Sequence, residues 1–142
     1  MNFFVPGIPQ SQGSKTAFNR KGGGRPIMIE ANAKTKPWRA DVREAGLAAR
    51  EMGFELLQDC VEVGITFFFP RPKCHFNSKG ALKAKSPSAP KGKPDIDKLA
   101  RAVLDALTGV CWKDDAQVVR LYVDKLYGDT PGARIEVGDL GV

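Results

Sequence analysis

Five aspartates within 21 residues follow the most basic part of the chain. Asp95 and Asp97 come first, and Asp114 and Asp115 close the series. Carboxylates beside a phosphate-binding surface repel the ligand unless divalent cations lie between the acids and the phosphate. The pattern therefore favours metal-dependent chemistry on a phosphate ester over simple binding. Such chemistry does not require the single histidine of the chain, His75.

Four of these aspartates also have an ordinary structural explanation. Asp95 directly precedes a predicted helix, so its side chain can cap the first N–H groups. Asp97 and Arg101 are one turn apart on the polar side of that helix, a spacing that suits an exposed ion pair. Asp114 and Asp115 suit a turn before the next strand. Each explanation is plausible alone, but all of them together in this order are less so.

The positive charge is concentrated in one loop. Residues 70–94 contain no acid and seven cations, which are Arg71, Lys73, Lys79, Lys83, Lys85, Lys91 and Lys93. The remaining 15 basic and 16 acidic residues give a net charge of −1. Because Pro, Gly and Ser disfavour regular structure, we expect a mobile loop at about 70–94. We expect its cations to contact phosphates, and Phe76 and His75 within it could stack on bases. A solvated linker explains the loop taken alone equally well.

The periodicity of apolar residues predicts one α/β domain over residues 1–142, with a small mixed sheet and two main helices in the order β-β-α-β-α-β-β. We expect a polar connection from Gln10 to Arg25 between the first two strands. The predicted strands are residues 2–8, 27–31, 61–69, 119–124 and 133–137, and the predicted helices are 37–52 and 96–108.

The same composition excludes several classes of protein. The three cysteines, Cys60, Cys74 and Cys111, are widely spaced without a Cys-x-x-Cys pair, so we expect reduced thiols and no structural zinc site. No run of about 20 apolar residues exists to span a membrane. The first residues lack the layout of a signal peptide, so we expect the protein to remain in the cytoplasm.

The position of Asp115 raises a geometric question. A helix over residues 96–108 is about 19 Å long. Seven residues extend at most about 23 Å, so Asp115 reaches Asp95 and Asp97 only if residues 109–115 run nearly extended beside the helix. Otherwise the acidic pair completes a site elsewhere, for instance in a partner subunit. Trp112 on this segment is expected to pack in the core.

The ordered motifs resemble the RusA family of Holliday junction resolvases, which are small dimeric α/β endonucleases of bacteria and their phages. The resemblance covers about 26 residues, and the order of strands and helices agrees with the family. It rests on Lys93-Pro94-Asp95-Ile96-Asp97, on Leu104-Asp105-Ala106-Leu107-Thr108-Gly109 and on Trp112-Lys113-Asp114-Asp115-Ala116-Gln117-Val118-Val119.

The resemblance implies that Asp95, Asp97 and Asp115 are catalytic metal ligands, with Asp114 as a further ligand or support. The implied cofactor is Mg²⁺, for which Mn²⁺ can substitute, and no small-molecule cofactor is implied. The family commonly has Asn where this chain has Lys98, and Lys where it has Arg101. Arg101 keeps the charge for the scissile phosphate but cannot act as an acid or base near neutrality.

The expected reaction is the resolution of four-way DNA junctions by paired Mg²⁺-dependent nicks in opposing strands, in recombination and repair. Two nicks require two sites, which a homodimer supplies in the bacterial or phage-infected cell. The cations expected to hold the DNA arms are Lys15, Arg20, Lys21, Arg25, Arg71, Lys73, Lys79, Lys83, Lys85, Lys91, Lys93 and Lys98.

Three other functions are compatible with parts of this pattern. A basic nucleic-acid-binding module without catalysis binds equally well in EDTA and never cuts. A metal-dependent nuclease for forks or flaps shares the fold but not the preference for four-way junctions. A metal phosphohydrolase for small molecules fits poorly, because a loop with seven cations is too large for such a ligand.

Overall fold

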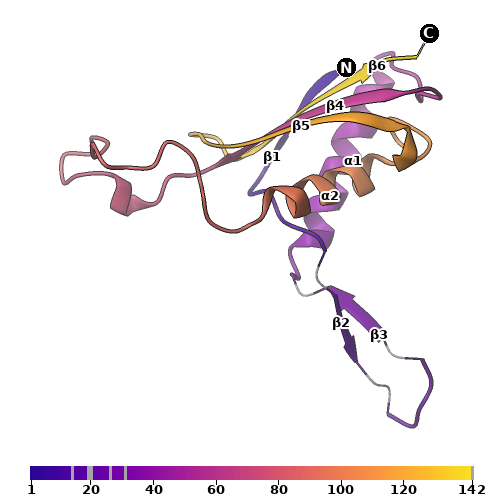
Figure 1. The fold of residues 1–142 in the computed structure, drawn as a ribbon, viewed down its shortest axis with the longest axis horizontal. Helices are drawn as coiled ribbons and strands as arrows, with labels where there is room; N and C mark the ends of the chain where they lie inside the picture. The colour runs from indigo at the N-terminus through magenta and orange to yellow at the C-terminus, as the bar shows by residue number, and fades with distance from the viewer. Residues whose placement is uncertain (14, 19–20, 26, 31, 142) are drawn as a thin grey trace.

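A four-stranded mixed sheet forms the centre of the molecule (Figure 1). The computed structural model describes residues 1–13, 15–18, 21–25, 27–30 and 32–141, with only the backbone for 15–18 and 27–30. The strand order is β1-β6-β4-β5, in which β4 and β5 are parallel and the other pairs antiparallel. The strands are β1 (Asn2–Pro6), β4 (Val61–Phe69), β5 (Val118–Tyr127) and β6 (Gly132–Asp139). The predicted small mixed sheet is confirmed.

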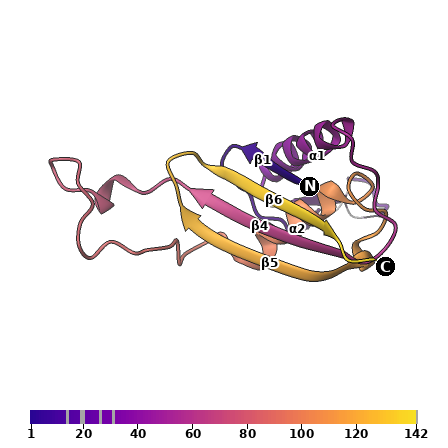
Figure 2. The ribbon, with the colours of Figure 1, turned by 90° about the horizontal axis from the view of Figure 1, so that it is seen from above.

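Two helices cover one face of this sheet and leave the other face open (Figure 2). Helix α1 (Thr35–Glu51) begins two residues before the predicted Pro37, which therefore lies in the first turn, where its missing N–H costs no hydrogen bond. Gly53, with φ +110°, follows its end. Helix α2 (Ile96–Leu107) matches its predicted range to within one residue.

The core lies between the sheet and the helices. Alternate residues of β4 from Val61 to Phe67 are buried, as their period of two predicts. They share a core cluster with the apolar face of α2, including Leu99, Val103 and Leu107. Trp112 is fully buried in this cluster, which confirms its expected packing role.

The segment between the first two predicted strands contains a strand that we did not predict. Strand β2 (Lys15–Phe18) pairs antiparallel with β3 (Ile27–Glu30) in a separate two-stranded sheet. The predicted polar connection from 10 to 25 is therefore wrong at 15–18. Three glycines at 22–24 have positive φ and allow the chain to reverse, so that β2 can pair with β3. This hairpin projects away from the sheet (Figure 1).

Residues 70–94, here called the basic arm, project from another end of the molecule (Figures 1 and 2). The arm contains a single 3₁₀ turn, η1 (Lys73–His75), and a bridge between Phe76 and Leu82. The carbonyl oxygen of His75 accepts hydrogen bonds from Lys83 N and Ser86 Oγ, both at 2.9 Å. The segment predicted as an irregular loop thus has a defined internal fold, because its limbs bond to each other.

The three cysteines differ in their exposure. Cys60 and Cys74 are exposed, Cys111 is buried, and all three are free. Burial raises the pKa of the Cys111 thiol to about 11. In the described part of the chain, neither helix has the length and apolar character needed to cross a membrane.

Iodoacetamide should therefore label two thiols per chain in the native protein at about pH 8, and all three in urea. Cys60 and Cys74 are accessible, whereas Cys111 is both buried and fully protonated at this pH. Intact-mass spectrometry counts the labels. Rapid labelling of all three thiols in the native protein would contradict the described core.

Candidate active site

Asp95 occupies the N-cap position of α2 without capping it. Its backbone is extended, with φ −69° and ψ 140°, and its side chain accepts no capping hydrogen bond. The predicted explanation of Asp95 as a side-chain cap is therefore wrong. The carboxylate is instead half exposed, with Oδ2 3.8 Å from Lys98 Nζ. It remains open to a ligand from solvent.

Asp97, Arg101 and Asp105 form a row along the exposed side of α2, because residues four apart lie one turn apart. Within the described residues, Asp97 and Arg101 form no ion pair, so the predicted pair is absent. The row borders a groove between α2 and β5, here called the α2 groove, of about 430 Å³. The groove is lined by Ile96, Asp97, Ala100, Arg101, Leu104, Asp105, Asp115, Leu121 and Val123.

Asp115 lies at the carboxyl end of α2 and still reaches the α2 groove. The chain turns directly after the helix, with Cys111 N donating to Leu107 O at 3.0 Å and Gly109 N to Trp112 O at 2.7 Å. Residues 109–115 therefore do not run extended beside the helix. Thr108 Oγ1 donates a hydrogen bond to Asp115 Oδ1, which fixes the carboxylate at this end.

Asp114 has a local structural role. It is the N-cap of the 3₁₀ turn η2 (Asp115–Gln117), and its Oδ1 accepts a hydrogen bond from Ala116 N at 2.9 Å. Gln117 completes a capping box by accepting from Asp114 N at 2.7 Å. This fits the predicted turn before the next strand, and it orients the neighbouring Asp115.

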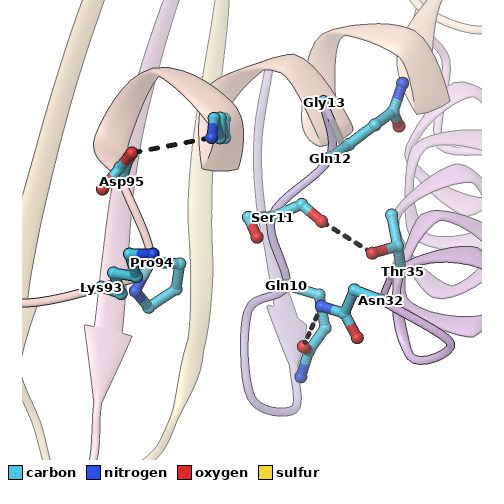
Figure 3. Close-up of a pocket in the computed structure, with 10 residues that line it drawn as sticks. Gln10, Ser11, Gln12, Gly13, Asn32, Thr35, Lys93, Pro94 and Asp95 are labelled. Carbon is cyan, nitrogen blue, oxygen red and sulfur yellow. Dashed lines mark hydrogen bonds and ion pairs between the residues drawn. The ribbon is translucent and has the colours of Figure 1, made fainter. Parts of the chain in front are cut away.

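Asp95 borders a second hollow, here called the α1–α2 pocket, of about 390 Å³ (Figure 3). It lies between the amino-terminal ends of the two helices and the segment that follows β1. Its lining is polar and includes Gln10, Ser11, Gln12, Gly13, Asn32, Thr35, Lys93, Pro94, Asp95 and Lys98. The first turn of α2 thus separates Asp95 from the α2 groove, which holds Asp97, Arg101 and Asp115.

Gln12 connects the two helices beneath these hollows. Its Oε1 accepts from Arg39 Nη1 of α1 at 2.7 Å, and its Nε2 donates to Asp105 Oδ2 of α2. Its backbone N donates to Lys98 O at 3.0 Å. The side chain is largely buried, with 9% exposure. The segment after β1 is therefore held by two bonds to α2 and one bond to α1, all through one residue.

Asp105 and Gln12 differ in how far the sequence points to them. Asp105 is one of the five aspartates in residues 95–115, but no role was predicted for it. Its spacing of four residues from Arg101 was the signal that could place it on the same face. Gln12 carries no comparable signal, because its partners are 27 and 93 residues away in the chain.

The donor set suits a magnesium ion bound together with a substrate. In the described part of the chain, no three His, Cys, Asp or Glu side chains are close enough to enclose a metal ion on their own. Mg²⁺ usually binds to one or two carboxylates and completes its shell with water and phosphate oxygens. Asp95, Asp97 and Asp115 are exposed carboxylates of this kind, so the residues fit the ion.

The predicted cations occupy both projections of the molecule. Lys21 and Arg25 are exposed at the tip of the β2–β3 hairpin. In the basic arm, Arg71 is partly buried and the six lysines are exposed. Arg20 lies outside the described residues, and only the backbone of Lys15 is described. The active-site candidates therefore lie on a body with a cationic projection at each of two ends (Figure 1).

Comparisons with known proteins identify the family of this chain. The family model described as endodeoxyribonuclease RusA matches residues 6–138. The chain is also 33% identical over 139 residues to YqaN, an uncharacterized protein of Bacillus subtilis (strain 168), with 96% of this chain and 93% of that protein covered. Because the family match covers nearly the whole chain, the chain belongs to the RusA endodeoxyribonuclease family.

Proposed function

We propose that this endonuclease resolves four-way DNA junctions by paired, Mg²⁺-dependent nicks in opposing strands. The observation that carries the proposal is the α2 groove, in which Asp97, Arg101 and Asp115 share one surface in a chain of the RusA family. A binding module would gain nothing from exposed carboxylates between two cationic projections, since they repel DNA. The cellular roles that fit this reaction are recombination and repair.

In this proposal Asp95 and Asp97 at the amino end of α2 and Asp115 at its carboxyl end would each bind metal together with water and substrate phosphate oxygens, rather than enclose one ion between them. Asp114 supports Asp115 through the cap of η2. Mg²⁺, or Mn²⁺ in its place, would supply the Lewis acidity that activates a water and neutralises the charge on the leaving 3′-oxygen. Arg101 donates to the non-bridging oxygens of the scissile phosphate and stabilises the charge that develops there. Gly13, at φ +150°, lets the chain approach this guanidinium, since a Cβ there would lie 3.1 Å from Arg101 Nη1.

The two projections hold the DNA arms through phosphate contacts. The basic arm contributes seven cations, and the hairpin contributes Lys15, Arg20, Lys21 and Arg25. Lys98 beside Asp95 extends this charge to the edge of the active site. Contacts of this kind carry little sequence information, which suits an enzyme that recognises the branched shape of its substrate.

A two-fold dimer provides the second active site that paired nicking requires. By the strand register, the sheet face that the helices leave open carries exposed apolar side chains, among them Phe4, Tyr122 and Leu126 at 39%, 58% and 40% exposure. Phe68 lies on the same face, with its ring centroid 6.5 Å from that of Phe4. An apolar patch on an open sheet is a typical protein-protein contact surface, and it supports a homodimer through this face.

Gln12 is a positioning residue in this proposal, because its side chain fixes α2 relative to α1. Replacing Gln12 by Ala should lower the free energy of unfolding by about 1–3 kcal/mol, since a largely buried amide bonds to two side chains. Urea denaturation measures this change. Gln58→Ala, at an exposed position, is the matched control and should change stability by less than about 0.5 kcal/mol. Equal effects of the two substitutions would show that the bonds of Gln12 contribute nothing.

Asp97→Asn should leave junction affinity unchanged and abolish cleavage. The substitution removes a metal ligand, while the basic arm and the hairpin remain intact. The loss of rate should exceed the roughly 10- to 100-fold that removal of an outer-shell partner costs. Gel-shift titration measures binding, and denaturing gels measure nicking.

Asp41→Asn is the control for charge, because Asp41 is an exposed acid of α1 that lines neither the α2 groove nor the α1–α2 pocket. It should cut at the wild-type rate. Wild-type cleavage by Asp97→Asn would contradict the proposed metal-binding role of Asp97.

The preference for junctions is tested by comparing cleavage rates on three substrates. Cleavage of forks and of linear duplex as fast as four-way junctions would contradict this preference.

A further inference from the structure

A cleft of about 270 Å³ lies where the basic arm leaves the sheet. It is lined by Pro70, Arg71, Phe76, Tyr127, Gly128 and Asp129. The carboxyl ends of β4 and β5 meet here, with Gly128 N donating to Phe69 O at 3.0 Å. Only Arg71 of these residues is among the cations assigned to phosphate contacts, so the cleft has no role in the nicking reaction proposed above.

A cation stacked on an aromatic ring forms the fixed wall of this cleft. The guanidinium carbon of Arg71 lies 4.4 Å from the centroid of the Tyr127 ring, and His75 meets the same ring edge-on at 5.4 Å. Arg71 Nη1 donates to Pro87 O at 2.7 Å and lies 3.3 Å from His75 Nδ1. Arg71 therefore ties the outgoing limb of the arm to the returning limb and holds the stack in place.

Phe76 forms a wall that is partly open to solvent. Its side chain is 37% exposed, and its backbone is held by the bridge to Leu82. Asp129 places an exposed carboxylate in the lining, where it can accept hydrogen bonds from a bound group. The cleft thus combines two aromatic rings, a stacked guanidinium and a hydrogen-bond acceptor.

We propose that this cleft binds one unstacked nucleobase of the branched DNA substrate. Aromatic rings and Arg planes bind bases through their π-faces, and a carboxylate accepts from exocyclic amino groups. The volume is just below the range of about 300–1,000 Å³ for drug-sized ligands, so it suits a single ring system. Asp129 disfavours a phosphate, which the lysines elsewhere on the arm bind better. The proposal rests on the proposed function for the source of the base, because base pairs at a branch point are the ones most easily unstacked.

The position of the cleft connects it with the active site. Val123 of the α2 groove and Tyr127 of the cleft lie on the same face of β5, four residues and about 14 Å apart. Between them, Lys125 Nζ donates to Gly92 O at 2.7 Å and Pro94 O at 2.8 Å. The end of the basic arm is therefore anchored to β5 just before Asp95. A base in the cleft would set the distance from the branch point to the nicked phosphate at a few nucleotides.

Phe76→Ala is the variant that tests this inference, and Leu82→Ala is its matched control. Both residues are exposed apolar members of one bridge in the basic arm, but only Phe76 lines the cleft. The probe is an oligothymidine that carries one 2-aminopurine, whose fluorescence reports stacking, titrated in EDTA. Phe76→Ala should weaken binding roughly fivefold or more and reduce the fluorescence change, whereas Leu82→Ala should match the wild type.

Junction cleavage provides the second readout. Phe76→Ala should shift or scatter the nick positions without changing the salt dependence of binding, because no cation is removed. Tyr127→Phe keeps the ring and should behave as the wild type. Wild-type behaviour of Phe76→Ala in both assays, or equal losses in Phe76→Ala and Leu82→Ala, would overturn the base-binding cleft. Failure of the wild type to cut junctions would instead reject the proposed function, and the oligothymidine titration would still decide the cleft.

Discussion

The apolar face of α2 is the constraint on which the candidate site depends. Leu99, Val103 and Leu107 are fully buried against the sheet, and burial of each such side chain stabilises the fold by about 1.5–3 kcal/mol. Because the helix has 3.6 residues per turn, this burial forces Asp97, Arg101 and Asp105 to the exposed side. The same packing therefore sets both the stability of the core and the direction of the polar row.

Connections from distant parts of the chain then fix the surroundings of α2. Gln12 joins the segment after β1 to both helices, and Thr108 holds Asp115 at the carboxyl end of α2. Lys125 anchors the end of the basic arm to β5. These bonds hold the segments around α2 in place, while the two projections extend away from the sheet (Figure 1).

The periodic elements were predictable from sequence, because β4 and α2 each bury one face in a regular pattern. The β2–β3 hairpin was not, since its short strands are stabilised by pairing with each other rather than by a core face. The position of Asp97 and Arg101 on one side of α2 was predictable from their spacing of four residues, and the same spacing places Asp105 beside Arg101. Asp95 was misjudged, because a residue at an N-cap position can leave its side chain unbonded. The turn that keeps Asp115 at the end of α2 depends on backbone bonds around Gly109, which has φ +82° and which spacing does not reveal.

The decisive experiment is incubation of the purified protein with a labelled immobile four-way junction, once in Mg²⁺ and once in EDTA. Native gels resolve the complexes and products, and denaturing gels locate the nicks. We expect paired, symmetric nicks in opposing strands that appear only with Mg²⁺. Tight binding without cleavage in either condition would contradict the proposed resolvase activity. The protein would then be a DNA-binding member of the family, and Lys98 and Arg101 would be the first residues to test as the cause of the lost activity.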